Sequence, residues 1–198
     1  MNLIILGPQG SGKGTQAKLL SLEYTVPHLS TGDMFREHKA QGTELGKRVQ
    51  AIMDAGGLVT DDLTNAMVAD RMKKPDVRTG FILDGYPRTI AQAEYLERIL
   101  SDLGQPPPKV VSYDVAVEKV VERISGRRSC PKCGAVYHVS ANPPQAAGYC
   151  DKEKADLVQR EDDKPENVKK RLMEYEEKTA PLKRFYKDRE QLVGLVAE

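Results

Sequence analysis

The chain has 198 residues, which is enough for one well-packed core with small appended subdomains. Its 30 basic and 29 acidic side chains leave a net charge of +1, so composition does not indicate a nucleic acid or a membrane surface as partner. No apolar segment approaches the roughly 20 residues that span a bilayer, and no signal peptide precedes the apolar run that begins at Leu3. We therefore expect a soluble, cytoplasmic, globular protein that binds neither nucleic acid nor membrane.

A glycine-rich segment, Gly7–Thr15 (GPQGSGKGT), separates the apolar run Leu3–Leu6 from a helical stretch, Thr15–Glu23. This order fits the phosphate-binding pattern G-x-x-x-x-G-K between a buried strand and a helix. Glycines let backbone N–H groups surround an anion, and Lys13 supplies a mobile charge for the outer phosphates. Gly14 stands where serine or threonine is usual, and the hydroxyl that can serve a magnesium shell comes at the next residue. The motif predicts a nucleoside triphosphate site.

Apolar runs and helical patterns alternate along the rest of the chain, which predicts a parallel sheet with helices on both faces. Further strands are expected at residues 28–29, 81–84, 109–115 and 192–196. Helices are expected at residues 33–40, 43–55, 61–73, 89–103 and 117–124, with Thr60 as the N-cap of the third. A charged helix begins at Pro165, is broken near Pro181 and continues as a second helix to about Gln191.

Residues 126–163 differ from the rest of the chain in pattern and composition. The helical periodicity disappears, and Cys, Pro and Gly become frequent. Short β-type pieces such as 135–139 predict a small inserted subdomain rather than a linker. All three cysteines of the chain, Cys130, Cys133 and Cys150, lie in this segment. An odd number of clustered cysteines argues against a disulfide framework and for a local metal site in a reducing compartment.

Asp84 ends an apolar run, and a carboxylate at the end of a buried strand can organise magnesium beside a phosphate loop. An ordinary cap or turn acid is the alternative. The segment Gly85–Thr89 then forms a rigid turn that would hold Arg88 as a clamp for phosphate. The alternatives are a solvated arginine and, for Gln92, a capping box made with Thr89.

Two more groups of polar residues point toward phosphate chemistry. Residues Ser30–Arg36 (STGDMFR) put a hydroxyl and an arginine at one helix start beyond a strand end, although Asp33 as a simple helix cap explains them equally well. Guanidinium forks stabilise charge on a transferred phosphoryl group, although each arginine alone is an ordinary surface ion-pair partner. The candidates are Arg123, Arg127, Arg128, Arg160 and Arg171. The only histidines are His28, His38 and His138, and the lack of an obvious general base suits an acceptor that is already an ionised phosphate.

Together these motifs resemble the adenylate kinase family over nearly the whole chain, from the phosphate loop to Pro181. The matching segments are GPQGSGKGTQ, STGDMFRE, DGYPRTIAQA, GRRSCPKCGAVYH and REDDKPENVKKRL. The resemblance implies reversible, magnesium-dependent phosphoryl transfer from ATP to AMP, giving two ADP, in a monomer. It implies a P-loop α/β fold made of a core with a parallel five-stranded sheet (residues 1–29, 60–125 and 164–198), an AMP-binding helical subdomain (30–59) and a small β-type lid (126–163). Closure of the lid would exclude the water that otherwise hydrolyses ATP.

The same resemblance assigns residues to the two nucleotides. ATP would contact Gly10, Ser11, Gly12, Lys13, Gly14, Thr15, Arg123, Arg127, Val136 and Tyr137. AMP would contact Thr31, Arg36, Gly57, Leu58, Val59, Gly85, Tyr86, Arg88, Gln92, Arg160 and Arg171. The catalytic set would be Lys13, Asp84, Arg88, Arg127, Arg160 and Arg171.

The lid cysteines resemble the metal-binding lid of that family, with Glu153 at a fourth position that is usually Cys or Asp. The thiolates of Cys130, Cys133 and Cys150 and one carboxylate can form a closed, structural zinc site. Because Glu is one methylene longer than Asp, the alternative is a surface acid beside reduced, metal-free cysteines. A second departure is the carboxyl end: Glu198 follows soon after the last strand, so the adenine contacts and the base specificity on the ATP side are left open.

Three other functions remain alternatives. A UMP/CMP or broad-specificity nucleoside monophosphate kinase shares these motifs, although Thr31, Gln92 and the long lid favour AMP. A P-loop regulator that binds ATP alone is disfavoured by Arg36 and by the turn that holds Arg88. A nucleic-acid-binding zinc ribbon is disfavoured because the lid is poor in lysine and rich in acids.

Overall fold

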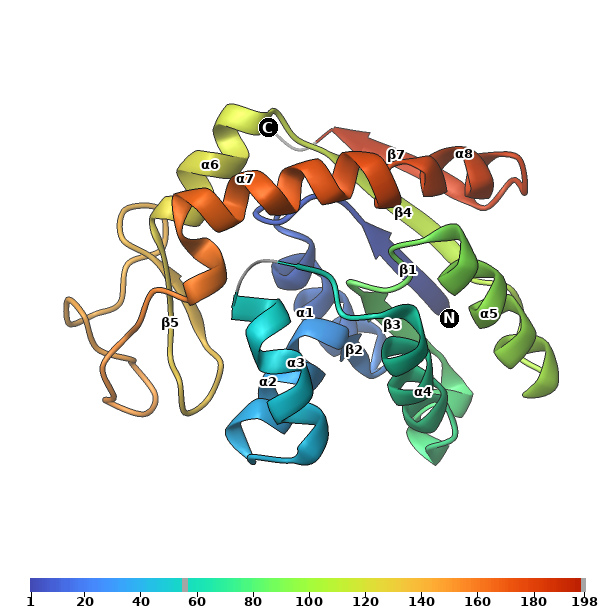
Figure 1. Ribbon diagram of the computed structural model, residues 1–198, viewed down its shortest axis with the longest axis horizontal. Helices are drawn as coiled ribbons and strands as arrows, with labels where there is room; N and C mark the ends of the chain where they lie inside the picture. Colours follow the sequence, from blue (N-terminus) through green and yellow to red (C-terminus); the bar gives the residue numbers. More distant parts are fainter. Residues whose placement is uncertain (55–56, 197–198) are drawn as a thin grey trace.

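Five strands form one parallel sheet in the order β2-β3-β1-β4-β7. The computed structural model describes residues 1–54 and 57–196 (Figure 1). The strands are β1 (Asn2–Leu6), β2 (His28–Ser30), β3 (Phe81–Asp84), β4 (Lys109–Asp114) and β7 (Leu192–Val196). The predicted α/β fold with a parallel five-stranded sheet is confirmed.

Helices connect these strands, and the longer ones pack around the sheet (Figure 1). The α-helices are α1 (Lys13–Tyr24), α2 (Thr31–Ala40), α3 (Glu44–Asp54), α4 (Asp61–Met72), α5 (Ile90–Asp102), α6 (Val117–Ser125), α7 (Pro165–Glu174) and α8 (Pro181–Lys187). Two 3₁₀ turns, η1 (Pro75–Thr79) and η2 (Glu161–Asp163), and one π-helical turn, η3 (Tyr175–Thr179), complete the helical elements. None of the described helices is both long and apolar enough to cross a membrane.

The side chains of β1 point alternately to the two faces of the sheet, so the core has two layers. Ile4 and Leu6 pack with buried residues of α4, α5 and α8, whereas Leu3 and Ile5 pack with Ala17 of α1 on the other face. All residues of β1 are buried. Since successive side chains of a strand point to opposite faces, a central strand covered on both sides must be apolar throughout.

The starts of two helices differ from the prediction. Ser30, not Asp33, is the N-cap of α2, because Ser30 Oγ accepts a hydrogen bond from the Asp33 N–H at 3.2 Å. The helix therefore begins at Thr31. Thr60 precedes α4 as predicted, but its side chain makes no capping hydrogen bond.

The ends of two other helices also bear on the prediction. The last helix ends at Lys187 and does not reach Gln191, because Glu190 adopts a left-handed backbone conformation (φ 55°) before the chain enters β7. The π-helical turn ends at Thr179 and α8 begins at Pro181, so the predicted break near this proline is confirmed. Ala55, the predicted end of α3, lies outside the described residues.

Two projections leave the core (Figure 1). The first, here called the arm, consists of α2 and α3, and its buried residues Phe35 and Val49 join Val59 and Met67 in one apolar cluster. The second is the lid segment, residues 126–163, which carries the antiparallel strands β5 (Arg127–Ser129) and β6 (Val136–His138). The predicted β-type character of the inserted segment is confirmed.

Candidate active site

A cleft of about 630 Å³ opens at the carboxyl ends of the strands, where parallel α/β sheets bind ligands. The structure brings most of the predicted nucleotide-binding residues to it: Gly10, Gly12, Lys13, Gly14, Thr15, Arg36, Leu58, Asp84, Gly85, Arg88, Arg123, Arg127, Val136, Tyr137, Arg160 and Arg171. A smaller adjoining pocket takes in the predicted Thr31, Gly57, Val59 and Gln92. Ser11 and Tyr86 are buried and line neither cavity.

The phosphate loop has the backbone of an anion cradle. Gly10 (φ 79°) and Gly12 (φ 92°) lie in the left-handed region that residues with a Cβ rarely adopt. Gly12 is the N-cap of α1, so the positive end of this helix faces the loop. Lys13 Nζ donates a hydrogen bond to the Pro8 carbonyl oxygen at 2.9 Å, which folds the lysine side chain back over the loop.

The ammonium of Lys13 lies in a strongly cationic environment. Burial lowers the pKa of Lys13 to about 8, the charge of Asp84 opposes this effect, and Arg88 and Arg171 lower the pKa further. A bound phosphate would reverse the shift, because a neighbouring anion favours the protonated amine. The site is therefore matched to an anionic ligand.

Asp84 ends β3 beside the phosphate loop and is 8% exposed. His28 Nε2, on neighbouring β2, lies 3.4 Å from Asp84 Oδ2. Burial raises the pKa of Asp84, but the proximity of His28 and the charge of Lys13 outweigh burial and hold the pKa below its usual value. A Cβ at Gly14 would lie 3.2 Å from Asp84 Oδ2, so the glycine that departs from the usual loop pattern makes room for this carboxylate.

Arg88 is fixed by a contact within its own turn and by two threonines from other elements. Its Nε donates a hydrogen bond to the Gly85 carbonyl oxygen at 2.8 Å, and Thr31 Oγ1 donates to the same oxygen at 2.8 Å. Thr179 Oγ1, in the π-helical turn, donates to the Arg88 carbonyl oxygen at 3.0 Å. Burial and then the charge of Arg171 lower the pKa of Arg88 to about 10, although Asp84 acts in the opposite direction. The turn thus holds Arg88 in a fixed position, and its role as a phosphate clamp stays a prediction.

Gln92 supports the same turn from α5. Its N–H donates to Thr89 Oγ1 at 3.1 Å, which confirms one half of the capping box. Its Oε1 accepts from the Arg88 N–H at 2.8 Å, one residue before the position that a capping box uses, and its Nε2 donates to Asp61 Oδ1 at 2.8 Å. Both ends of the amide thus help to fix Arg88.

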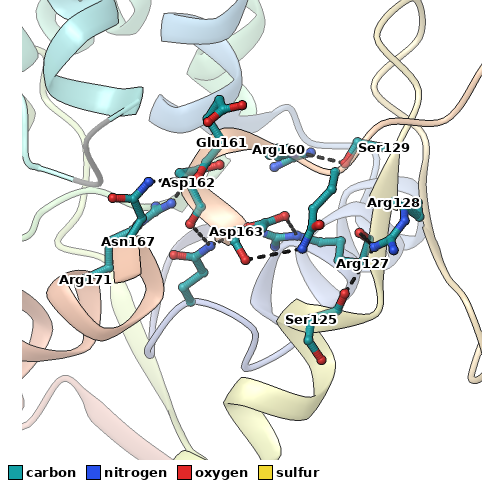
Figure 2. Close-up of polar contacts among 12 residues, drawn as sticks. Ser125, Arg127, Arg128, Ser129, Arg160, Glu161, Asp162, Asp163, Asn167 and Arg171 are labelled. Carbon is teal, nitrogen blue, oxygen red and sulfur yellow. Dashed lines mark hydrogen bonds and ion pairs between the residues drawn. The ribbon is translucent and has the colours of Figure 1, made fainter. Parts of the chain in front are cut away.

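Three arginines of the cleft are each paired with an aspartate. The pairs are Arg36–Asp33, Arg127–Asp163 and Arg171–Asp162. Figure 2 shows the last two, between the start of the lid segment and α7. The sequence predicted the arginines but not these acidic partners. The available signal was the pair of aspartates shortly after Arg160.

Arg160 and Arg128, which lie in the same region, behave differently (Figure 2). Arg160 Nε donates to Ser129 Oγ at 2.9 Å, and burial together with nearby arginines lowers the pKa of Arg160 to about 10. Arg128 donates instead to the carbonyl oxygens of Ser125 and Arg127, at 3.1 and 2.7 Å, and does not line the cleft. Of the two, Arg160 is the one available to a phosphate group.

The three lid thiols lie together. The sulfurs of Cys130, Cys133 and Cys150 are all within 4.8 Å of one another, which is compatible with one metal ion. The carboxylate of Glu153 is not part of this group, although the Glu153 N–H donates to Cys150 Sγ at 3.5 Å. The hydroxyl of Tyr137 lies 3.6 Å from the same sulfur.

Cations from the phosphate loop, the Arg88 turn, the lid segment and α7 thus face one cleft, and they are too many for a single phosphate group. The fold and this cleft define a phosphotransferase of the P-loop class.

The adenylate kinase family model matches residues 5–191. An adenylate kinase from Anaeromyxobacter sp. (strain Fw109-5) is 74% identical over 197 residues, which cover 100% of this chain and 90% of that protein. Adenylate kinases from Anaeromyxobacter dehalogenans (strain 2CP-1 / ATCC BAA-258) and Oceanobacillus iheyensis are 70% and 52% identical, over 97% and 98% of this chain and 90% of each relative. The chain belongs to the adenylate kinase family and is an enzyme of that class.

Proposed function

We propose that the cleft transfers a phosphoryl group between ATP on the phosphate loop and AMP in the smaller pocket, giving two ADP. The observation that carries this proposal is that Arg36, Arg88 and Arg171 line both cavities. A guanidinium at the boundary between two phosphate seats can hold the acceptor and stabilise the group in transit. Lys13, Arg127 and Arg160 supply the remaining positive charge from the donor side.

Catalysis then rests on positioning and electrostatics. The acceptor phosphate is already ionised, so no general base is required. The aspartates paired with Arg36, Arg127 and Arg171 keep these guanidiniums oriented. A planar guanidinium binds a carboxylate and a phosphate through the same pairs of N–H groups. Each arginine can therefore bind a phosphate in place of its aspartate, or in addition to it, without changing shape.

Magnesium is the cofactor expected with ATP, and the donor set fits it. The carboxylate of Asp84, whose pKa is lowered, and the exposed residue Thr15 offer the hard oxygen donors that Mg²⁺ prefers, directly or through water. When bound, the ion would neutralise charge on the ATP phosphates. Asp84 itself is held against His28 and beneath Gly14, so its orientation is restricted.

We also propose that residues 30–59 and 126–163 close over a core of 1–29, 60–125 and 164–198, and that closure excludes water. Support comes from the lid segment's own buried cluster, which allows it to move as a unit, and from the position of both projections along the cleft, which Arg36 of the arm and Tyr137 of the lid segment line. The three lid thiols fit a structural zinc ion, and Glu153 completes a tetrahedral site only if its side chain turns toward them. A monomer in the cytoplasm, where the three thiols stay reduced, is part of the same proposal.

The test is ADP formation from ATP and Mg²⁺ with AMP, CMP, UMP or GMP as acceptor. We expect a clear preference for AMP, and calorimetry should detect AMP binding without ATP. Equal rates with CMP or UMP would replace the proposal by a broad-specificity kinase. Failure of AMP to bind would replace it by a regulator that uses ATP alone.

A further inference from the structure

Gln9 occupies a variable position of the phosphate-loop pattern, yet its side chain has specific partners. Gln9 Nε2 donates a hydrogen bond to Asp163 Oδ1 at 2.7 Å and a longer one to the Asp162 carbonyl oxygen at 3.3 Å. Asp162 and Asp163 belong to η2, where the lid segment returns to the core. One side chain thus joins the phosphate loop to the base of the lid segment.

Asp163 is the centre of this connection. It is 1% exposed, and Arg127 Nε donates to its Oδ2 at 2.8 Å while Arg127 Nη2 shares Oδ1 with Gln9 (Figure 2). Arg127 Nη1 makes no hydrogen bond among the described residues, and Arg127 lines the cleft. Asp163 therefore holds one edge of the guanidinium and leaves the other edge for a phosphate.

We propose that Gln9 is a positioning residue: through Asp163 it aligns the guanidinium of Arg127 with the phosphate loop. Without Gln9, the Arg127–Asp163 pair is anchored only to the lid segment and η2. With Gln9, the pair is tied to the loop that cradles the triphosphate, so one outer phosphate meets Lys13 and Arg127 in a fixed relative position. This inference rests on the proposed function, in which Arg127 contacts ATP.

A direct contact between Gln9 and ATP is the competing explanation. Gln9 lines the cleft, and its Oε1 is buried without a hydrogen-bond partner in the described structure. The two explanations differ in what they require of Asp163. A positioning role disappears when Asp163 can no longer hold Arg127, whereas a direct contact does not depend on Asp163.

The first experiment compares Gln9→Met with Gln50→Met, a control at an exposed glutamine of α3. We expect Gln9→Met to raise the KM for ATP about fivefold, which is the net contribution of one ordinary hydrogen bond, because the effect reaches ATP only through Asp163 and Arg127, and the KM for AMP should be unchanged. Gln9→Glu should raise it further, because it sets a second carboxylate against Asp163. Gln50→Met should behave as the unaltered enzyme, and circular dichroism should report the same melting temperature for Gln9→Met and Gln50→Met. An unchanged KM for ATP in Gln9→Met, or an equal rise in both KM values, overturns the inference.

The second experiment is a double-mutant cycle. In an Asp163→Asn background, and separately in an Arg127→Ala background that leaves Asp163 in place, Gln9→Met should have no further effect on the KM for ATP. A persisting fivefold effect in both overturns the inference in favour of direct contact. If Arg127→Ala by itself leaves the KM for ATP unchanged, the proposed function of Arg127 fails. If Arg127→Ala raises it and Gln9→Met does not, only the role of Gln9 fails.

Discussion

The arm and the lid segment project over the same cleft, yet different interactions stabilise them. The arm shares an apolar cluster with the core, in which Phe35 of α2 and Val49 of α3 meet Met67 of α4. Gly46 allows the two arm helices to approach closely, because a Cβ there would lie 2.2 Å from the His38 carbonyl oxygen. The arm is therefore an extension of the hydrophobic core.

The lid segment has no comparable cluster. Its buried apolar residues are Cys130, Tyr137 and Cys150, with only small or partly buried neighbours. A short segment with so little apolar surface usually needs a cross-link or a metal to hold its fold. A projecting segment can thus be stabilised by sharing the core or by a local cluster of thiols, and only the second would respond to a chelator if a metal ion is bound.

We expect the largest effect from Lys13→Met. Lys13 lies at the transfer centre that both the arm and the lid segment are proposed to serve. We expect kcat to fall about a thousandfold, as when a preorganised charge is removed from a transition state. The circular dichroism spectrum should be unchanged, and Lys119→Met, at an exposed lysine of α6, should retain full activity. Near-normal turnover of Lys13→Met would remove the phosphate loop from the mechanism.

Arg88→Lys tests the smaller pocket, which is next to the arm and is the proposed AMP site. A point charge cannot reproduce the fork that donates to Gly85 and faces the smaller pocket, so we expect kcat to fall about 10- to 100-fold and the KM for AMP to rise. The KM for ATP should change much less. Arg98→Lys, at an exposed arginine of α5, is the control. Equal changes in the two KM values would contradict a separate AMP seat.

Removal of a metal ion should destabilise the lid segment, which depends on its thiols, but not the arm, which depends on apolar packing. If zinc is bound to Cys130, Cys133 and Cys150, one equivalent should be found by elemental analysis after purification without chelator. Its removal should lower the melting temperature by about 4–8 °C, the shift that about 2 kcal/mol produces in a chain of this size. Val49→Ala, a fully buried arm residue, should give a similar decrease that neither chelator nor added zinc alters. A metal-free protein with an unchanged melting temperature would refute the zinc proposal.

The pH dependence of nucleotide binding should also distinguish the ATP side of the cleft, at Lys13, from the AMP side, at Arg88. In the free enzyme the pKa of Lys13 is lowered to about 8, so the amine is protonated below pH 8 and neutral above it. ATP binding then requires proton uptake above pH 8, and affinity should fall up to tenfold per pH unit. AMP affinity should stay level to pH 9, because the pKa of Arg88 is about 10. Calorimetry between pH 7 and 9 measures both, and Lys13→Arg should abolish the fall for ATP. A flat ATP profile would mean that the Lys13 charge does not contribute to binding.

Much of the fold and site could be predicted from local pattern. Leu3–Leu6 followed by the glycine-rich loop predicts a central strand and a phosphate cradle, because burial on both faces and a tight anion-binding turn each demand specific consecutive residues. Helix ends were less predictable. Ser30 rather than Asp33 caps α2, and this choice depends on where β2 delivers the chain.

The phosphate loop, the alternation of strands and helices and the set of cationic residues are each encoded in neighbouring residues, so they can be predicted without the fold. How these cations are held depends on contacts between distant parts of the chain. Asp163 meets both Arg127 and Gln9 across large separations in the chain, and Gly14 faces Asp84 because β1 and β3 are adjacent in the sheet. The position of the Glu153 carboxylate outside the thiol group was likewise a matter of side-chain placement, which residue spacing does not specify.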